Sequence, residues 1–288
     1  MWSKNIVNFI GCDSEYEEAD IVLYGAPFDS TTSFRPGARF GCQAVRAESF
    51  GLETYSPYQE KELTDGKVFD SGDPELPMGS TEESLRMIEE RCAAILADGK
   101  LPFLIGGEHL VTLGAVRAAQ KKYPDLAIIH LDAHADLRED YLGVKLSHAC
   151  VMRRCWELVG DGSIWQLGIR SGDREEFRWA GEGHVQMSPF GLQDAKAAAV
   201  EFKGRPVYLT LDLDVLDPSV FPGTGTPEAG GVTFSELLLA LLEICGNAQI
   251  VGCDAVELSP HYDASGVSTA TAGKVIRELL IALANKRN

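Results

Sequence analysis

The chain has 288 residues, of which 45% are hydrophobic and 24% are charged, and its formal net charge is −17. These fractions exclude a disordered or collagen-like chain, and the negative charge argues against a nucleic-acid partner and against an anionic membrane surface. An excess of negative charge is compatible with a cationic substrate, although it also serves solubility alone.

Targeting signals and cysteine usage point to the cytoplasm. The apolar residues of the segment 1–12 are too scattered for the core of a signal peptide. No window approaches the roughly 18 continuous apolar residues of a membrane helix. The seven cysteines contain no C-x-x-C pair, which favours reduced thiols, buried as inert core residues, over a disulfide framework. We therefore expect a cytoplasmic protein without a membrane partner.

Seven short apolar runs recur along the chain. Several of them are continuously apolar rather than alternating, which is typical of strands that are covered on both faces of a parallel sheet. The predicted strands are Ile21–Tyr24, Val68–Phe69, Pro102–Ile105, Ala127–Leu131, Ile164–Leu167, Val207–Leu211 and Ile250–Val256.

Helical patterns lie between these runs. Capping-box pairs, a glycine stop and a final apolar helix give the clearest signals. They are Ser80 with Glu83, the stop at Gly99, Thr233 with Glu236, and Val275–Leu283. Strands that alternate with helices indicate βαβ units, so we predict an α/β fold and a single domain over residues 1–288.

Acidic residues and histidines follow the predicted strands at the end where such sheets bind ligands. Residues two apart in an extended segment point to the same face, so Asp132, His134 and Asp136 would converge, as would Asp212 and Asp214. An imidazole, His109, follows a Gly-Gly turn. If these strands are neighbours, the sequence places four carboxylates and two imidazoles in one crevice.

Such a cluster favours a metal centre over a solvated acidic rim. Two carboxylates about 4 Å apart repel by roughly 4 kcal/mol at an effective dielectric constant near 20, so four of them could not all stay ionised without cations. Oxygen and imidazole donors without a nearby thiolate favour Mn²⁺ or a similar ion over structural zinc. Two such ions can activate a bridging water as hydroxide near neutral pH, which indicates metal-assisted hydrolysis.

Several motifs surround these residues in a fixed order. They are Tyr24–Asp29, Ser33–Gly37, Gly106–His109, Asp132–Asp136, Thr210–Asp214, Pro222–Thr226 and Val256–Glu257. Together they resemble the arginase/agmatinase (ureohydrolase) superfamily, most closely its bacterial agmatinases. The resemblance implies an arginase-like fold of three α/β/α layers with a mainly parallel central sheet. It also implies two Mn²⁺ per subunit and a homo-oligomer, a trimer or a hexamer.

The resemblance further implies a role for each site residue. One Mn²⁺ would be bound by His109, Asp132, Asp136 and Asp212, and the other by Asp132, His134, Asp212 and Asp214. Glu257 would hold the substrate guanidinium, and His148 would carry protons to the leaving amine. Asp214 would help to stabilise the tetrahedral intermediate formed when the bridging hydroxide attacks the guanidino carbon. The expected reaction is hydrolysis of agmatine to putrescine and urea.

Alternatives stay open for the substrate. The segment Leu137–Leu146 resembles agmatinases and lacks the Asn/Ser/Thr-rich pattern of arginases. Agmatine is a dication without a carboxylate, which suits an acidic protein. Guanidinobutyrate, guanidinopropionate, arginine and formimidoylglutamate remain candidates, as do a deacetylase-like amide hydrolase and a non-catalytic regulator. Glu257 argues against the amide hydrolase, and the complete set of ligands argues against the regulator.

The remaining polar motif residues have structural interpretations. His130 shares the face of Asp132 by alternation and is interpreted as a core or supporting histidine. We expect His184 at the surface, and His261 at the surface or at the rim of the pocket. Loop-bracing ion pairs are the interpretation favoured for Asp29 and Arg35.

Overall fold

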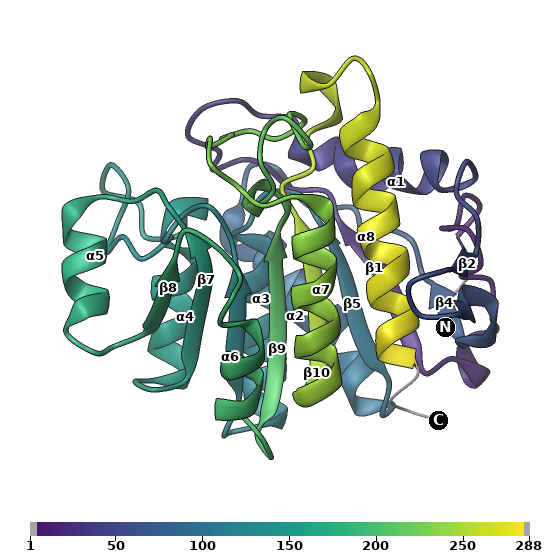
Figure 1. Ribbon diagram of the computed structural model, residues 1–288, viewed down its shortest axis with the longest axis horizontal. Coiled ribbons are helices and arrows are strands. Elements are labelled where there is room, and N and C mark those ends of the chain that lie inside the picture. The colour runs from purple at the N-terminus through teal and green to yellow at the C-terminus, as the bar shows by residue number, and fades with distance from the viewer. Residues whose placement is uncertain (1–4, 285–288) are drawn as a thin grey trace.

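Within residues 5–284, which the computed structural model describes, eight strands form one sheet in which all neighbouring strands run parallel. Helices cover both faces of this sheet (Figure 1). The strands lie in the order β4 (Val68–Asp70), β1 (Ile21–Ala26), β5 (Leu101–Gly106), β10 (Gln249–Val256), β9 (Pro206–Asp212), β6 (Ala127–Leu131), β7 (Ile164–Ile169) and β8 (Gln186–Pro189). The predicted single domain of three layers is confirmed. Residues 1–4 and 285–288 lie outside the described residues, and so do the first four residues of the N-terminal segment 1–12 considered above.

All seven predicted strands are present, each within two residues of its predicted ends. Their continuous apolar runs are explained by burial on both faces, since every residue of β1 and β5 is buried. The sequence analysis missed β8, an edge strand whose residues include Gln186 and Ser188 and therefore form no apolar run. It also missed the two-residue strands β2 (Tyr55–Ser56) and β3 (Lys61–Glu62), which pair with each other.

Two groups of helices enclose the sheet. One face is covered by α1 (Gly41–Ser49), α6 (Ala195–Glu201), α7 (Phe234–Asn247) and α8 (Val267–Ala284). The other face is covered by α2 (Thr81–Ala97), α3 (Val111–Lys122) and α4 (Val151–Val159), and α5 (Arg174–Gly181) lies outside β8 (Figure 1). Short 3-10 helices connect these elements: η1 (Tyr16–Glu18), η2 (Ala38–Phe40), η3 (Leu63–Asp65), η4 (His148–Cys150), η5 (Leu213–Val215) and η6 (Pro260–Tyr262).

The predicted helix starts agree with the observed ones to different extents. Thr233 and Glu236 form the complete capping box of α7. Ser80 accepts the backbone N–H of Glu83, whereas the Glu83 carboxylate pairs with Arg86 and does not return a bond to Ser80. The final helix begins at Val267, eight residues before the predicted start. Its first turn is capped by Asp263, which accepts the N–H of Ser268 over 2.7 Å.

A buried ion cluster joins α1 to β4. Arg46 is 2% exposed, and its guanidinium donates to both carboxylate oxygens of Asp70, at 2.8 and 3.0 Å. The guanidinium also pairs with Asp73. Asp70 in turn accepts the backbone N–H of Phe9, so one charged pair connects the N-terminal segment, the edge strand and a helix.

We expect Arg46→Ala to lower the free energy of unfolding by roughly 3–5 kcal/mol, because it leaves a buried carboxylate without its cation. Urea unfolding of the metal-free protein measures the change. Arg86→Ala serves as control, since Arg86 forms exposed pairs with Glu83 and Glu90 that are worth less than about 1 kcal/mol. Equal losses in the two variants would contradict the prediction.

The central strands deliver four chain segments to one edge of the sheet. β5, β10, β9 and β6 are consecutive neighbours and parallel, so the loops that follow them meet at their carboxyl ends. Among residues 5–284, no helix has the length and apolar character to cross a membrane.

Candidate metal centre and active site

Three carboxylates surround one nitrogen of His109 at the carboxyl ends of the central strands. The Nδ1 atom lies 3.0 Å from Asp132 Oδ2, 3.2 Å from Asp136 Oδ2 and 3.4 Å from Asp212 Oδ2. All four side chains are buried. These residues were predicted from the sequence to share one metal ion, and the structure brings their ligand atoms together.

A second group of ligand atoms lies beside the first. His134 Nδ1 is 3.4 Å from Asp132 Oδ1 and 3.1 Å from Asp214 Oδ2. Asp132 therefore points one oxygen to each group, an arrangement that suits a ligand shared by two ions. Asp212 Oδ2 faces His109, and its Oδ1 accepts the N–H of Asp214 over 2.8 Å, just as Asp132 Oδ1 accepts the N–H of His134 over 2.6 Å.

The electrostatics of the cluster fit divalent cations. Burial, followed by the charge of Asp132, raises the pKa of Asp136 to about 7. Burial and the charge of Asp214 likewise raise the pKa of Asp212. Burial alone would lower the pKa of His109, but the surrounding carboxylates raise it well above its usual value. The cluster thus attracts positive charge, and its oxygen and imidazole donors are ligands that borderline divalent ions accept.

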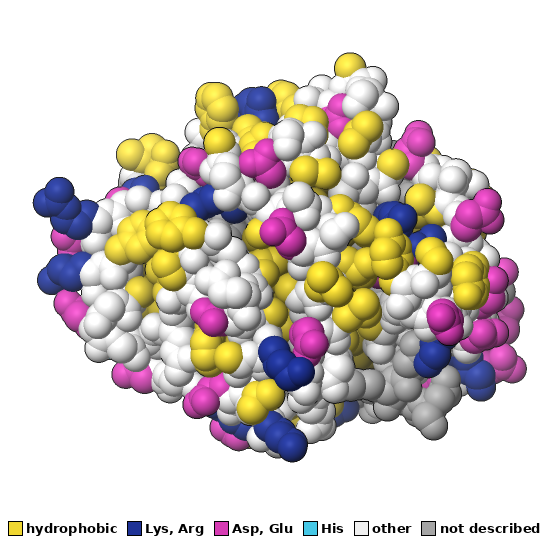
Figure 2. Space-filling view, in the orientation of Figure 1, with side chains coloured by type: hydrophobic (Ala, Val, Ile, Leu, Met, Phe, Trp, Pro, Cys, Tyr) yellow, Lys and Arg dark blue, Asp and Glu magenta, His cyan; other side chains and the backbone are white. Residues whose placement is uncertain are grey.

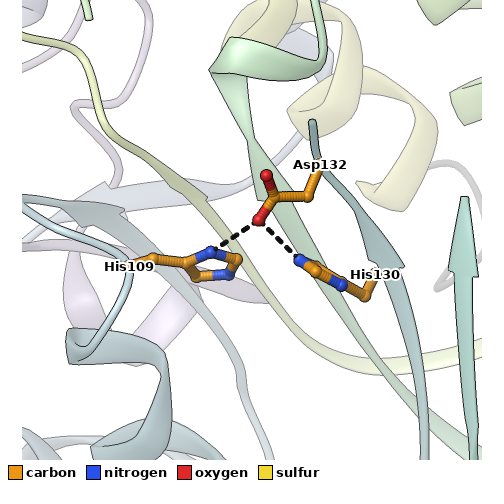
Figure 3. A group of neighbouring side chains, drawn as sticks. All are labelled: His109, His130 and Asp132. Carbon is orange, nitrogen blue, oxygen red and sulfur yellow. Dashed lines mark hydrogen bonds and ion pairs between the residues drawn. The ribbon is translucent and has the colours of Figure 1, made fainter. Parts of the chain in front are cut away.

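His130 forms a hydrogen bond to the carboxylate of Asp132 (Figure 3). Its Nε2 lies 2.8 Å from Asp132 Oδ2, and both side chains are fully buried. The Gln166 amide donates to the Ala135 carbonyl over 2.6 Å and to His130 Nδ1 over 3.0 Å. Since Nδ1 accepts a hydrogen bond from this amide, the proton of the neutral ring is on Nε2, which donates a hydrogen bond to Asp132. The interpretation of His130 as a supporting residue agrees with this geometry, although its ring atoms also lie close enough to His109 and Asp132 to be grouped with them as metal ligands.

One glycine, Gly107, allows the substrate side of the site to form next to the metal side. A Cβ on Gly107 would lie 2.0 Å from the Phe28 carbonyl oxygen, so no other residue fits there. The Gly107 carbonyl accepts the N–H of Glu257, and Glu257 Oε1 accepts the N–H of His109 over 2.8 Å. Glu257 itself has a φ of +68°, an uncommon conformation for a residue with a side chain and one that concentrates at functional sites.

His148 faces Glu257 across the site. Its Nδ1 lies 4.0 Å from Glu257 Oε1, and its Nε2 accepts the backbone N–H of Ser33 over 3.1 Å. A backbone N–H can only donate, so the proton of the neutral ring is on Nδ1, toward Glu257. Burial, with a smaller contribution from the charge of His134, lowers the pKa of His148 to about 4. His148 is therefore neutral at pH 7.

The loop that holds His148 escaped the sequence analysis. Glu108 is fully buried, and its carboxylate accepts the Thr31 N–H and the hydroxyls of Thr31 and Thr32. Thr31 Oγ1 accepts the backbone N–H of His148. Burial raises the pKa of Glu108 to about 7. The one available signal was the Ser33–Gly37 motif, which contains Ser33.

The remaining motif residues lie where the sequence analysis expected them. Asp29 accepts the Gly37 N–H and pairs with Arg39, and Arg35 donates to the carbonyls of Thr224 and Gly225, so both brace loops. Arg35 thus uses carbonyl partners in place of the expected ion pair.

The two histidines expected near the surface lie away from the metal centre. His184 pairs with Asp161 and stacks on Trp179. The exposed His261 packs against Phe40, with ring centroids 4.7 Å apart, and does not line the cavity beside the metal centre.

That cavity opens beside the second group of ligand atoms. Its volume is about 230 Å³, and it is lined in part by Ser33, His134, Arg138, Tyr141 and His148. Arg138 pairs with Asp173 at 3.0 Å and with Glu176 at 3.6 Å. The positive charge of this arginine is therefore already met by two carboxylates.

A sequence model described as the arginase family matches residues 19–282. The chain belongs to the arginase family. Within it, the chain is 50% identical to an agmatinase of Bacillus subtilis over 275 residues, which cover 95% of each chain. It is 34% identical to a guanidinobutyrase of Pseudomonas aeruginosa, over 94% of this chain and 88% of that one.

A solved structure of the arginase family has the same architecture. The agmatine ureohydrolase of Thermoplasma volcanium superposes with a TM-score of 0.88 at 34% identity, over 97% of this chain and 94% of that chain. The predicted superfamily and its arginase-like fold are thus confirmed.

Proposed function

We propose that this protein is a metal-dependent agmatinase, which hydrolyses the guanidinium group of agmatine to putrescine and urea. The observation that carries the proposal is a buried carboxylate, Glu257, hydrogen-bonded to the backbone of a residue of the metal-ligand cluster. A guanidinium that binds Glu257 is thereby held next to that cluster. The relative named agmatinase at 50% identity supports the same substrate.

Two Mn²⁺ ions are proposed as the cofactor. His109, Asp132, Asp136 and Asp212 would hold one ion, and Asp132, His134, Asp212 and Asp214 would hold the other. When bound, divalent cations lower the pKa of water and so make a strong nucleophile available at neutral pH. The donor set without thiolate supports Mn²⁺ over structural zinc.

Three side chains would act on the substrate. Glu257 would orient the guanidinium by charge-assisted hydrogen bonds. Burial and then the charge of Glu108 raise the pKa of Glu257 well above its usual value, so a cationic substrate would favour its ionised form. His148 would carry a proton from water to the leaving amine, since its neutral ring must take up a second proton before it can donate one and return to the neutral form. Asp214 would help to stabilise the tetrahedral intermediate at the guanidino carbon.

The ion pairs formed by Arg138 favour agmatine over guanidino acids as the substrate. A substrate with a carboxylate needs a free cation at the far end of the cavity, and the arginine that lines this cavity is paired with Asp173 and Glu176. Guanidinobutyrate is the second candidate, because a guanidinobutyrase is 34% identical to this chain. Guanidinopropionate, arginine and formimidoylglutamate rank below it.

The Mn²⁺-loaded protein is expected to release urea from agmatine with a kcat/KM at least about tenfold above that for guanidinobutyrate, guanidinopropionate or arginine. An unpaired carboxylate in the cavity costs more than the 1.4 kcal/mol that corresponds to this ratio. Urea release and, for formimidoylglutamate, formamide release measure the ranking. Faster turnover of a guanidino acid would overturn agmatine as the substrate.

Three further statements remain predictions. The cytosolic location is supported by the cysteine usage, the role in polyamine biosynthesis by the proposed product putrescine, and the trimeric or hexameric state by the family resemblance. Hydrophobic side chains gather between scattered charges on the face that carries α7 and α8 (Figure 2). The exposed side chains of Phe190 and Leu239 border a groove there of about 560 Å³. This groove is compatible with self-association.

A further inference from the structure

A buried chain of hydrogen bonds leads away from His109 on the side opposite the cluster. His109 Nε2 lies 3.0 Å from Thr210 Oγ1, and the Thr210 hydroxyl donates to Asp254 Oδ1 over 2.7 Å. Thr210 and Asp254 are direct neighbours across β9 and β10. The three side chains are at most 1% exposed.

The direction of the protons in this chain follows from Asp254. Its Oδ1 also accepts the backbone N–H of Leu211 at 3.3 Å, so this oxygen is an acceptor and the Thr210 hydroxyl proton points toward it. A hydroxyl has a single proton, so the Thr210 oxygen must accept from His109 Nε2–H. The proton of the neutral ring is then on Nε2, and the lone pair on Nδ1 faces the carboxylates of Asp132, Asp136 and Asp212.

This orientation is unfavourable unless a cation lies between the lone pair and the carboxylates. It is the orientation that a metal ligand requires, since a ligating histidine commonly donates its other N–H to a fixed acceptor. Asp254 is fully buried, and its bonds to the Thr210 hydroxyl and the Leu211 amide are bonds to neutral groups. Neutral partners offset little of the cost of burying a carboxylate, so a role in the site accounts for its presence.

We propose that Asp254, acting through the Thr210 hydroxyl, is a positioning residue that holds His109 in its metal-binding tautomer and orientation. The inference rests on the proposed metal centre and extends it to two residues outside the predicted ligand set. A second hydroxyl, that of Thr112 on α3, lies 3.4 Å from Thr210 Oγ1 and can donate to it.

Thr210→Val removes the hydroxyl and keeps the shape of the side chain. We expect it to weaken binding of one of the two Mn²⁺ ions by about 10- to 100-fold, with little change for the other. Thr210→Ser, which restores the hydroxyl, should bind both ions nearly as tightly as the parent. Calorimetric titration of the metal-free, full-length protein with Mn²⁺ measures both sites.

A double-mutant cycle separates a relay from a general loss of packing. Asp254→Leu, which removes the acceptor of the Thr210 hydroxyl, should weaken Mn²⁺ binding in the parent but have no further effect in the Thr210→Val background, because the hydroxyl that connects Asp254 to His109 is already absent. Ser56→Ala is the control, since it removes an equally buried hydroxyl that bonds a carboxylate outside the metal centre, that of Glu278. If Thr210→Val does not fold, Asp254→Leu alone still tests the relay.

The outcomes are distinguishable. Equal Mn²⁺ affinity for the parent, Thr210→Val and Asp254→Leu would overturn the relay and leave the metal centre intact. Additive losses in the cycle would also overturn it. Absence of Mn²⁺ binding by the parent protein would overturn the proposed metal centre and, with it, this inference.

Discussion

Glu257→Gln is expected to lower kcat/KM for agmatine by about 10²- to 10³-fold, because loss of one charge from a buried, hydrogen-bonded ion pair costs roughly 2–5 kcal/mol. The substituted amide keeps a carbonyl oxygen that can accept the N–H of His109, so the metal-ligand cluster should remain in place. Steady-state urea release gives the rate, and metal analysis should still find two Mn²⁺ per chain.

A Glu-to-Gln substitution at a buried position outside the site serves as the control. Glu278→Gln alters a carboxylate on α8 that lies outside the site and is also buried and hydrogen-bonded, to the side chains of Ser56 and Gln59. It should leave kcat/KM within a few-fold of the parent. Full retention of urea release by Glu257→Gln would show that Glu257 does not anchor the guanidinium.

Asp132→Asn is expected to have the largest effect of all. Asp132 points one oxygen to each group of ligand atoms, and an amide cannot supply two anionic oxygens. We expect metal content to fall from two Mn²⁺ to one or none, and kcat/KM to fall by about 10³-fold or more, because the activated water is lost. Elemental analysis after dialysis and urea release measure the two quantities.

The control for Asp132→Asn carries the same change of charge. Asp161→Asn removes a surface carboxylate that pairs with His184, and it should change neither quantity. If Asp132→Asn kept two ions and most of its activity, Asp132 would not bridge them. In that case Asp212, which is proposed above to hold both ions as well, would be left as the shared ligand.

The pattern of apolar residues predicted those strands that are buried on both faces of the sheet. The strand β6 was predicted to the residue, because its five residues, four of them apolar, are buried on both faces and Asp132 ends the run. β8 was missed because it lies at the edge, where a strand needs no apolar run. The early start of α8 depends on the Asp263 side chain, whose capping role the apolar pattern of the helix does not report.

The predicted site residues converge as expected, but their supporting partners could not be identified. Glu108 meets Thr31 across 77 positions of sequence, and Ser33 meets His148 across 115. Such contacts are set by the strand order, which the hydrophobic pattern does not contain. The pairing of Arg138 with Asp173 is of the same kind, and without it the charge of the cavity would have been misjudged.

The hydrogen bond from the His109 backbone to Glu257 has a geometric consequence. The ring of His109 faces the metal-ligand cluster, whereas its peptide N–H holds the proposed guanidinium anchor. A single residue therefore connects the proposed guanidinium anchor to the metal-ligand cluster. Because this bond joins the loops that follow β5 and β10, small movements of the two strands would carry the anchor and the cluster together, so the separation between them is insulated from motions of the surrounding sheet.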